Sequence, residues 1–242
     1  MDNLNLCIDI GNTLLKAALF EKNRLVEKEV FNTEDVLLEW VTSRHWQHAI
    51  LCTVRASEEK IVPLLRERGY FSVFNSSLKL PIQNRYATPE TLGVDRLASV
   101  VGAHALYPDK DCLVVDAGTC VTYDLVTCAG SYLGGSISPG LQMRFKALHH
   151  FTAKLPLLDA HGEAGLLGND TSSCIRSGVV NGLLFELEKI IAQYRQTYPD
   201  LQVLFCGGDA PFFESRIKET IFVHPDLVLV GLNHTLIHNA PL

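Results

Sequence analysis

The sequence lacks the features that would place the protein in a membrane, on nucleic acid or outside the cell. No run of about 18 apolar residues is present, so no membrane-spanning helix is expected. The amino-terminal stretch, Met1 to Asn5, has neither the basic head nor the apolar core of a secretion signal. The formal net charge is −6, which argues against the basic surface of a nucleic-acid-binding protein. These absences predict a cytoplasmic protein with neither membrane nor nucleic acid as a partner.

The cysteine pattern excludes two further classes. The seven cysteines are odd in number and scattered, none is in a C-x-x-C pair, and several lie in apolar runs. They are therefore expected to be reduced and to act as small hydrophobes. His149, His150 and His161 match no ligand spacing, so we interpret them as solvated loop residues rather than metal ligands.

The common nucleotide-binding signatures are also missing. There is no G-x-x-x-x-G-K-[ST] loop, no G-x-G-x-x-G fingerprint and no protein-kinase motif set. If the protein binds a nucleotide, it does so through another kind of loop.

One candidate is the stretch from Leu6 to Phe20, where an apolar run ends in Asp9 and a Gly-Asn-Thr turn follows. We interpret it as a β-hairpin in which Gly11 and Asn12 permit positive φ. Phosphate oxygens could be bound by the backbone N–H groups of the turn, the Thr13 hydroxyl and the Lys16 cation. A metal ion or water would then lie between the phosphate and Asp9. An ordinary hairpin with an aspartate at its mouth explains the same residues.

The layout recurs at Leu113 to Val126, where an apolar run again ends in D-x-G-T. Asp116 minus Asp9 is 107, and Gly118 minus Gly11 is also 107. A repeat at the start of each half suggests a duplicated domain, with halves 1–111 and 112–242. The two carboxylates would then face each other across a nucleotide cleft.

The remaining pattern predicts an α/β protein. Before residue 80 the order is strand, strand, strand, helix, strand, helix, strand, followed by a loop rich in proline and polar residues. A long helix is expected from 168 to about 194, with Gly178 and Gly182 on one face. That face fits either core packing between the halves or a subunit interface.

Five motifs appear in the order found in type III pantothenate kinases, and the chain resembles that family. They are D-x-G-N-T-x-x-K (9–16), G-x-D-R (93–96), D-A-G-T (116–119), G-G-x-I-x-P-G (134–140) and G-N-D-T (168–171). The family belongs to the acetate and sugar kinase, chaperone ATPase and actin superfamily. The resemblance therefore implies two ribonuclease-H-like (actin-like ATPase) halves with the nucleotide in the cleft between them.

The resemblance also implies an activity: ATP-dependent phosphorylation of pantothenate to 4′-phosphopantothenate, the first step of coenzyme A biosynthesis. It implies potassium or ammonium as a monovalent cation, magnesium with ATP, and a homodimer. Asp95 matches the family's proton acceptor and Asp116 its monovalent-cation ligand. The implied ATP-binding residues are Asp9, Ile10, Gly11, Asn12, Thr13, Leu14, Leu15, Lys16 and Thr119. The implied pantothenate-binding residues are Tyr86, Gly93, Val94, Asp95, Arg96 and Thr171.

Several of these residues also fit structural roles. Asp95 could be the N-cap of a helix that begins at Arg96, Arg96 could lie on that helix's surface, and Asp116 could satisfy turn amides. Cys120 stands where the family commonly has alanine after D-A-G-T, and a thiol near phosphate could be oxidation-sensitive. Two other functions remain open: a kinase of the same superfamily acting on a sugar or carboxylate, and a non-catalytic nucleotide-binding module.

Overall fold

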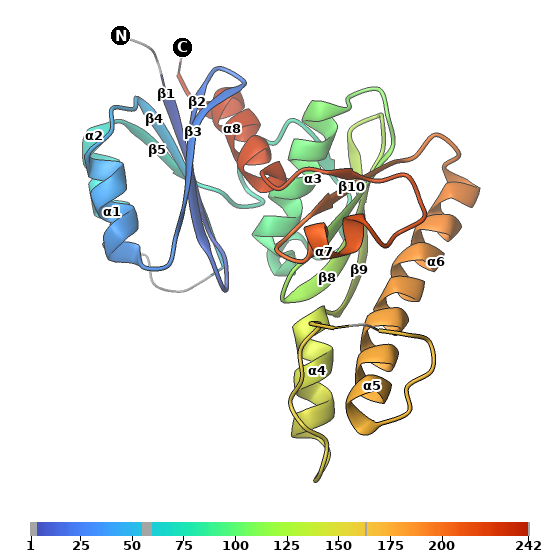
Figure 1. The fold of residues 1–242 in the computed structure, drawn as a ribbon. Helices are drawn as coiled ribbons and strands as arrows, with labels where there is room; N and C mark the ends of the chain where they lie inside the picture. Colours follow the sequence, from blue (N-terminus) through green and yellow to red (C-terminus); the bar gives the residue numbers. More distant parts are fainter. Residues whose placement is uncertain (1–3, 55–59, 163, 242) are drawn as a thin grey trace. The chain divides into compact units, whose positions relative to one another are not determined.

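The computed structural model describes residues 4–54, 60–162 and 164–241. Residues 1–3, part of the stretch in which no secretion signal was found, lie outside these ranges. The chain forms two compact units (Figure 1). The first comprises the described residues of Met1–Asp109, Leu125–Gly134 and Asp226–Leu242. The second comprises those of Lys110–Asp124 and Gly135–Pro225.

The strands and helices follow the expected α/β order. Those before residue 110 are β1 (Leu4–Ile10), β2 (Leu15–Glu21), β3 (Arg24–Phe31), α1 (Glu34–Thr42), β4 (His48–Thr53), α2 (Ile61–Arg68), β5 (Tyr70–Val73), β6 (Gln83–Asn84), the 3₁₀ turn η1 (Pro89–Thr91) and α3 (Val94–Leu106). Those after it are β7 (Cys112–Ala117), β8 (Cys120–Val126), β9 (Ser131–Pro139), α4 (Leu141–His150), α5 (Thr171–Arg176), the π-helical turn η2 (Ser177–Asn181), α6 (Gly182–Thr197), β10 (Gln202–Cys206), α7 (Ala210–Glu214), β11 (Phe222–Val223) and α8 (Leu227–Asn239).

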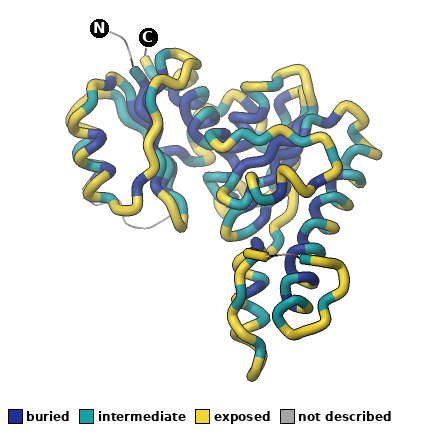
Figure 2. The backbone as a smooth tube through the Cα atoms, viewed as in Figure 1, coloured by how far each residue is buried: buried dark blue, intermediate teal, exposed yellow. Residues whose placement is uncertain are grey.

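The first sheet has the strand order β3-β2-β1-β4-β5 and buries both faces of β1. Side chains alternate between the faces of a strand, so Leu6, Ile8 and Ile10 share one face. They belong to a core cluster with Leu37 and Trp40 of α1 and with residues of α2, which cover this face (Figures 1 and 2). The predicted hairpin is β1 and β2, which pair antiparallel.

The opposite face of the first sheet carries Asn5, Cys7 and Asp9, and α8 packs against it. The Asn5 side chain donates to Asn233 Oδ1 of α8 at 2.9 Å. In turn α8 packs on α3, where Gly102 and Gly231 bring the backbones together: a Cβ on Gly231 would lie 1.8 Å from the Ala98 carbonyl oxygen. The last described helix therefore completes the core of the first unit.

The second sheet has the order β11-β10-β7-β8-β9-β6. Read from the other side, β9-β8-β7-β10-β11 repeats the order of the first sheet, with β6 added beside β9. In both sheets the first strand pairs in parallel with the fourth, β1 with β4 and β7 with β10. The duplication predicted from the two D-x-G stretches is thus confirmed. The division at residue 111/112 and the cleft between the halves stay predictions.

The expected helix from 168 to 194 is divided into α5, η2 and α6. A Cβ on Gly178 or Gly182 would meet no atom within 4 Å among the described residues. The two glycines are exposed, and within the described chain they are not core contacts. No helix in the described ranges is long and apolar enough to cross a bilayer.

Candidate functional site

The phosphate-binding hairpin predicted at Asp9 to Lys16 turns over residues 11–14. The Gly11 N–H donates to the Leu14 carbonyl at 3.0 Å, and Asn12, Thr13 and Leu14 are exposed. Gly11 and Asn12 are residue types that permit positive φ, but neither adopts it here. Four residues connect the strands, and none of them has left-handed backbone. A Cβ on Gly11 would lie 3.2 Å from the Leu14 carbonyl oxygen, closer than most Cβ contacts, so glycine suits this position.

Asp9 is the penultimate residue of β1 and lies on the face of the first sheet that also carries Asn5 and Cys7. The strand register places Lys16 of β2 opposite it on one side and Cys52 of β4 on the other. Directly opposed side chains lie on the same face within about 5.5 Å between Cβ atoms. The side chains of Lys16 and Asp9 therefore start from neighbouring positions at the base of the exposed turn.

Asp9 and Asp95 both act on the buried side chain of Cys52. Burial raises the pKa of the Cys52 thiol well above its usual value, and the charges of Asp9 and Asp95 raise it further. Both carboxylates therefore lie close enough to this buried side chain to disfavour a thiolate. The first unit brings the predicted proton acceptor and the aspartate of the phosphate hairpin into one site.

Asp95 is in the first turn of α3, which begins two residues earlier than expected, at Val94. The N-cap is Gly93, so the alternative role of Asp95 as N-cap is wrong. Asp95 Oδ1 accepts from the Arg96 backbone N–H at 2.8 Å. A Cβ on Gly93 would lie 2.7 Å from the same oxygen, so glycine at 93 leaves the carboxylate its space.

Arg96 is 7% exposed and is not a surface residue of α3. Its guanidinium lies over the Tyr86 ring, 5.7 Å from the centroid, and Tyr86 stacks on the buried Tyr132 with centroids 6.1 Å apart. Gly134 has φ of +102°, and a Cβ there would touch Tyr86 at 3.4 Å. Sequence reasoning missed Tyr132, because only the pairing of β6 with β9 brings it to Tyr86.

The second unit supplies the D-A-G-T turn between β7 and β8. The Gly118 N–H donates to the Cys120 carbonyl at 2.9 Å and closes the turn. The backbone packs closely against this turn at two other glycines. A Cβ on Gly140 would lie 2.3 Å from the Gly118 carbonyl oxygen, and a Cβ on Gly207 would lie 2.4 Å from Asp116 Oδ1. The turn is therefore held between two segments of backbone.

Asp116 is the penultimate residue of β7 and lies opposite Cys206 of β10, as Asp9 lies opposite Cys52. The described residues hold no group of three or more His, Cys, Asp or Glu side chains able to bind a metal ion. A single carboxylate in a turn rich in carbonyl oxygens suits a weakly held, oxygen-coordinated cation rather than a structural metal.

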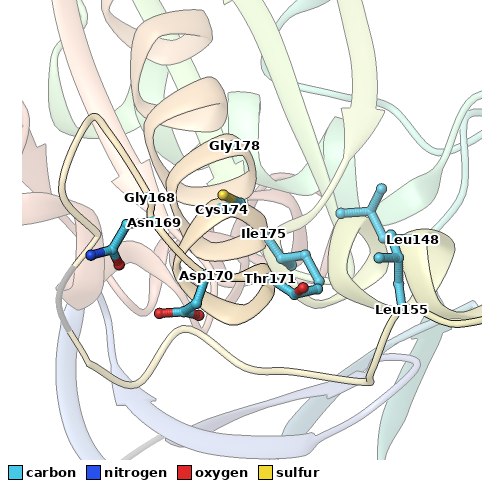
Figure 3. A pocket seen from close by; sticks show the side chains of 9 residues that line it. All are labelled: Leu148, Leu155, Gly168, Asn169, Asp170, Thr171, Cys174, Ile175 and Gly178. Atoms are coloured by element: carbon cyan, nitrogen blue, oxygen red, sulfur yellow. The ribbon is translucent and has the colours of Figure 1, made fainter.

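Thr171 is the first residue of α5 and lines a pocket of about 660 Å³ in the second unit (Figure 3). Asp170 caps the helix by accepting from the Ser173 N–H at 2.9 Å, a bond that lowers the pKa of Asp170. Leu148, Leu155 and Ile175 form the apolar wall of the pocket. The G-N-D-T motif thus gives one pocket both a hydroxyl and a carboxylate.

The duplicated sheet with a polar turn after the first strand of each half defines the sugar-kinase and actin-like ATPase fold. A Campylobacter jejuni protein described as a Baf family transcriptional activator has a TM-score of 0.62 and 21% identity, with 97% of this chain and 98% of that one covered. A glucokinase from an Antarctic psychrotroph has a TM-score of 0.56 and 14% identity, with 99% and 100% covered.

The sequence comparisons narrow this fold to one family. The family model described as type III pantothenate kinase matches residues 5–193. A type III pantothenate kinase from Bacteroides fragilis is 45% identical over 240 residues, 98% of each chain. The chain belongs to the type III pantothenate kinase family.

Proposed function

We propose that the protein transfers the γ-phosphoryl group of ATP to the 4′-hydroxyl of pantothenate, which begins coenzyme A biosynthesis. Family membership supplies the reaction. The observation that carries it to this chain is that the charges of Asp9, at the base of the hairpin turn, and of Asp95 both act on the buried Cys52 thiol. The proposed acceptor-hydroxyl base and the proposed phosphate-binding turn then belong to the same unit.

The reaction needs few covalent steps from the protein. The pantothenate hydroxyl oxygen bonds to the γ-phosphorus, the bond to the β,γ-bridging oxygen breaks, and ADP leaves. The hydroxyl proton passes to the Asp95 carboxylate. Because the transition state of phosphoryl transfer is loose, positioning and charge neutralisation supply most of the catalysis. Magnesium carried by ATP neutralises phosphate charge when bound.

The other site residues would bind and orient the two substrates. The backbone N–H groups of residues 11–14, the Thr13 hydroxyl and the Lys16 ammonium suit the ATP phosphates. Thr119 in the second unit would contact ATP as well. For pantothenate, Tyr86 would be a further contact beside Arg96, and the buried Arg96 supplies a cation suited to a carboxylate. Thr171 would add a hydroxyl.

A coupled ADP-release assay with pantothenate, ATP, magnesium and potassium tests the proposal. Turnover with pantothenate supports it. Turnover with a sugar but not with pantothenate would favour a different kinase of this fold. ATP binding without turnover on either acceptor would favour a non-catalytic nucleotide-binding module.

We further propose that Asp116 helps to bind a potassium or ammonium ion. A cation there would offset the repulsion between this carboxylate and the phosphates of ATP. Replacing potassium by sodium at constant ionic strength is expected to lower the rate at least about tenfold, because the smaller ion fits a site of fixed oxygens poorly. The measurement is the initial rate in each chloride salt, and equal rates in the two salts would remove this role from Asp116.

The protein is also proposed to be a homodimer that assembles through its second unit. Large apolar side chains are exposed there: Phe151 at 82%, Leu166 at 78%, Leu167 at 92% and Phe185 at 53%. Exposed apolar residues of this size are typical of protein interfaces. Light scattering coupled to gel filtration should give twice the monomer mass for the wild type and a lower mass for Leu167→Asp. A monomeric wild type at micromolar concentration would contradict the assembly.

A cytoplasmic location is proposed as well. Among the described residues no disulfide joins any of the seven cysteines, and Cys7, Cys52, Cys112 and Cys206 are buried. Thiols used as core residues suit a reducing compartment. Fractionation of cells expressing the chain checks this.

A further inference from the structure

Outside the residues assigned above, the second unit contains a charged network centred on Glu186 of α6. Glu186 Oε1 accepts from the Tyr123 hydroxyl at 2.9 Å, and Oε2 accepts from Arg144 Nη2 at 2.5 Å. Tyr123 is fully buried, and the Arg144 and Glu186 side chains are 21% and 25% exposed. The carboxylate therefore joins β8, α4 and α6 at a partly buried position.

Arg144 has a second set of partners at the end of β9. Its Nε donates to the Pro139 carbonyl at 2.9 Å, and its Nη2 also donates to Ser138 Oγ at 2.9 Å. A guanidinium bound on one side by a carboxylate and on the other by backbone has a fixed orientation. Glu186 thereby fixes the last residues of β9 through Arg144.

The next residue, Gly140, packs against the D-A-G-T turn. A Cβ added to Gly140 would lie 2.3 Å from the Gly118 carbonyl oxygen and 2.4 Å from the Thr119 carbonyl oxygen. At such separations the two backbones are in direct contact, so a displacement of Pro139 and Gly140 must displace the turn. The turn carries Asp116 and Thr119, the proposed ligands of the cation and ATP.

Electrostatics keep the network in its charged form. Burial of Glu186 acts to raise its pKa, but hydrogen bonds from Arg144, Ser138 and Tyr123 lower it by more, and the resulting pKa is below the usual value. Glu186 is therefore ionised near neutral pH and presents a full charge to Arg144.

We propose that Glu186 and Arg144 are positioning residues for ATP and cation binding, acting on the Asp116–Thr119 turn through Pro139 and Gly140. The inference rests on the proposed function, because it assigns the turn to ATP. It also gives α6 a role in nucleotide binding at a distance from the reacting atoms.

The test is Glu186→Gln, which keeps the size of the side chain and removes its charge. KM for ATP and the potassium concentration for half-maximal activation are each expected to rise about tenfold, the scale of a lost supporting contact behind a ligand. KM for pantothenate should change less than twofold. Calorimetric titration with a non-hydrolysable ATP analogue should show the same tenfold loss of affinity without turnover.

Glu219→Gln is the matched control, because Glu219 pairs with Arg195 at the other end of α6. The two side chains are 27% and 29% exposed, close to the values for Arg144 and Glu186. The control should lower Tm by about as much as Glu186→Gln does, but it should leave ATP affinity unchanged. Wild-type ATP affinity in Glu186→Gln, or an equal loss in Glu219→Gln, would overturn the proposal.

Arg144→Lys keeps the positive charge but cannot hold Glu186 and the Pro139 carbonyl at once. It should show the same loss of ATP affinity, so the proposal stays testable if Glu186→Gln does not fold. Calorimetric titration measures ATP binding without turnover, so it tests this proposal separately from the proposal that pantothenate is the phosphoryl acceptor. A wild type that binds the ATP analogue but does not phosphorylate pantothenate would contradict the proposed reaction and leave the role of Glu186 measurable.

Discussion

Asp95→Asn is expected to lower kcat by about 10²- to 10⁴-fold, the usual range for loss of a general base. The proton of the pantothenate hydroxyl would have no acceptor as the oxygen attacks. ATP affinity should stay within about twofold, because the hairpin turn that would hold the phosphates is untouched. Steady-state kinetics with pantothenate and calorimetric titration with an ATP analogue measure the two effects.

Asparagine is a suitable replacement because it keeps an oxygen at the position that accepts from the Arg96 N–H. The start of α3 should therefore survive, and far-UV circular dichroism should match the wild type. Glu90→Gln is the control, since it removes an exposed carboxylate from the nearby turn η1. Wild-type turnover in Asp95→Asn, or an equal loss in Glu90→Gln, would remove Asp95 from the mechanism.

Gly231→Ala is expected to lower the free energy of unfolding by about 3 kcal/mol or more, at or beyond the upper end of the usual cost of overpacking. The added methyl would lie 1.8 Å from the Ala98 carbonyl oxygen and 2.9 Å from the Gly102 nitrogen. Both atoms are backbone, so no side chain can rotate away, and α8 must separate from α3.

The two tryptophans make this effect measurable. Trp40 and Trp46 are both in the core cluster of the first sheet, so their fluorescence follows unfolding of the first unit in urea. Gly182→Ala serves as control: a Cβ there meets nothing within 4 Å in the described chain, and alanine favours the helix. It should leave the urea midpoint unchanged or raise it slightly. A midpoint for Gly231→Ala within error of the wild type would show that the helices separate without cost.

The parts of the site that could be predicted from the sequence are contiguous segments. The hairpin and its repeat are visible because an apolar strand followed by D-x-G-N/T is a local pattern, and the duplicated sheets confirm it. Asp95 and Arg96 were identified through a four-residue motif. The N-terminal boundary of α3 was misplaced because glycine at 93, a weaker cap signal than aspartate, is the actual N-cap.

The parts that could not be predicted depend on long-range pairing. Cys52 reaches Asp9 because β4 pairs with β1, and 43 residues separate the two side chains along the chain (52 minus 9). Glu186 joins residues of β8, β9 and α4 that no periodicity relates to one another. The length of the turn is not fixed by its residue types either: Gly11 and Asn12 permit positive φ, yet the four-residue connection between β1 and β2 does not use it.

The packing of α8 on the first sheet has a consequence for synthesis at the ribosome. Strands β1 to β5 emerge first, yet the helix that covers Cys7, Ala18 and Ile50 emerges after all the other described elements. For most of translation one face of the nascent sheet is an uncovered apolar surface, a species prone to aggregation. The Gly102–Gly231 crossing closes only after residue 231 has left the exit tunnel, so the earliest-made unit is the last to finish folding.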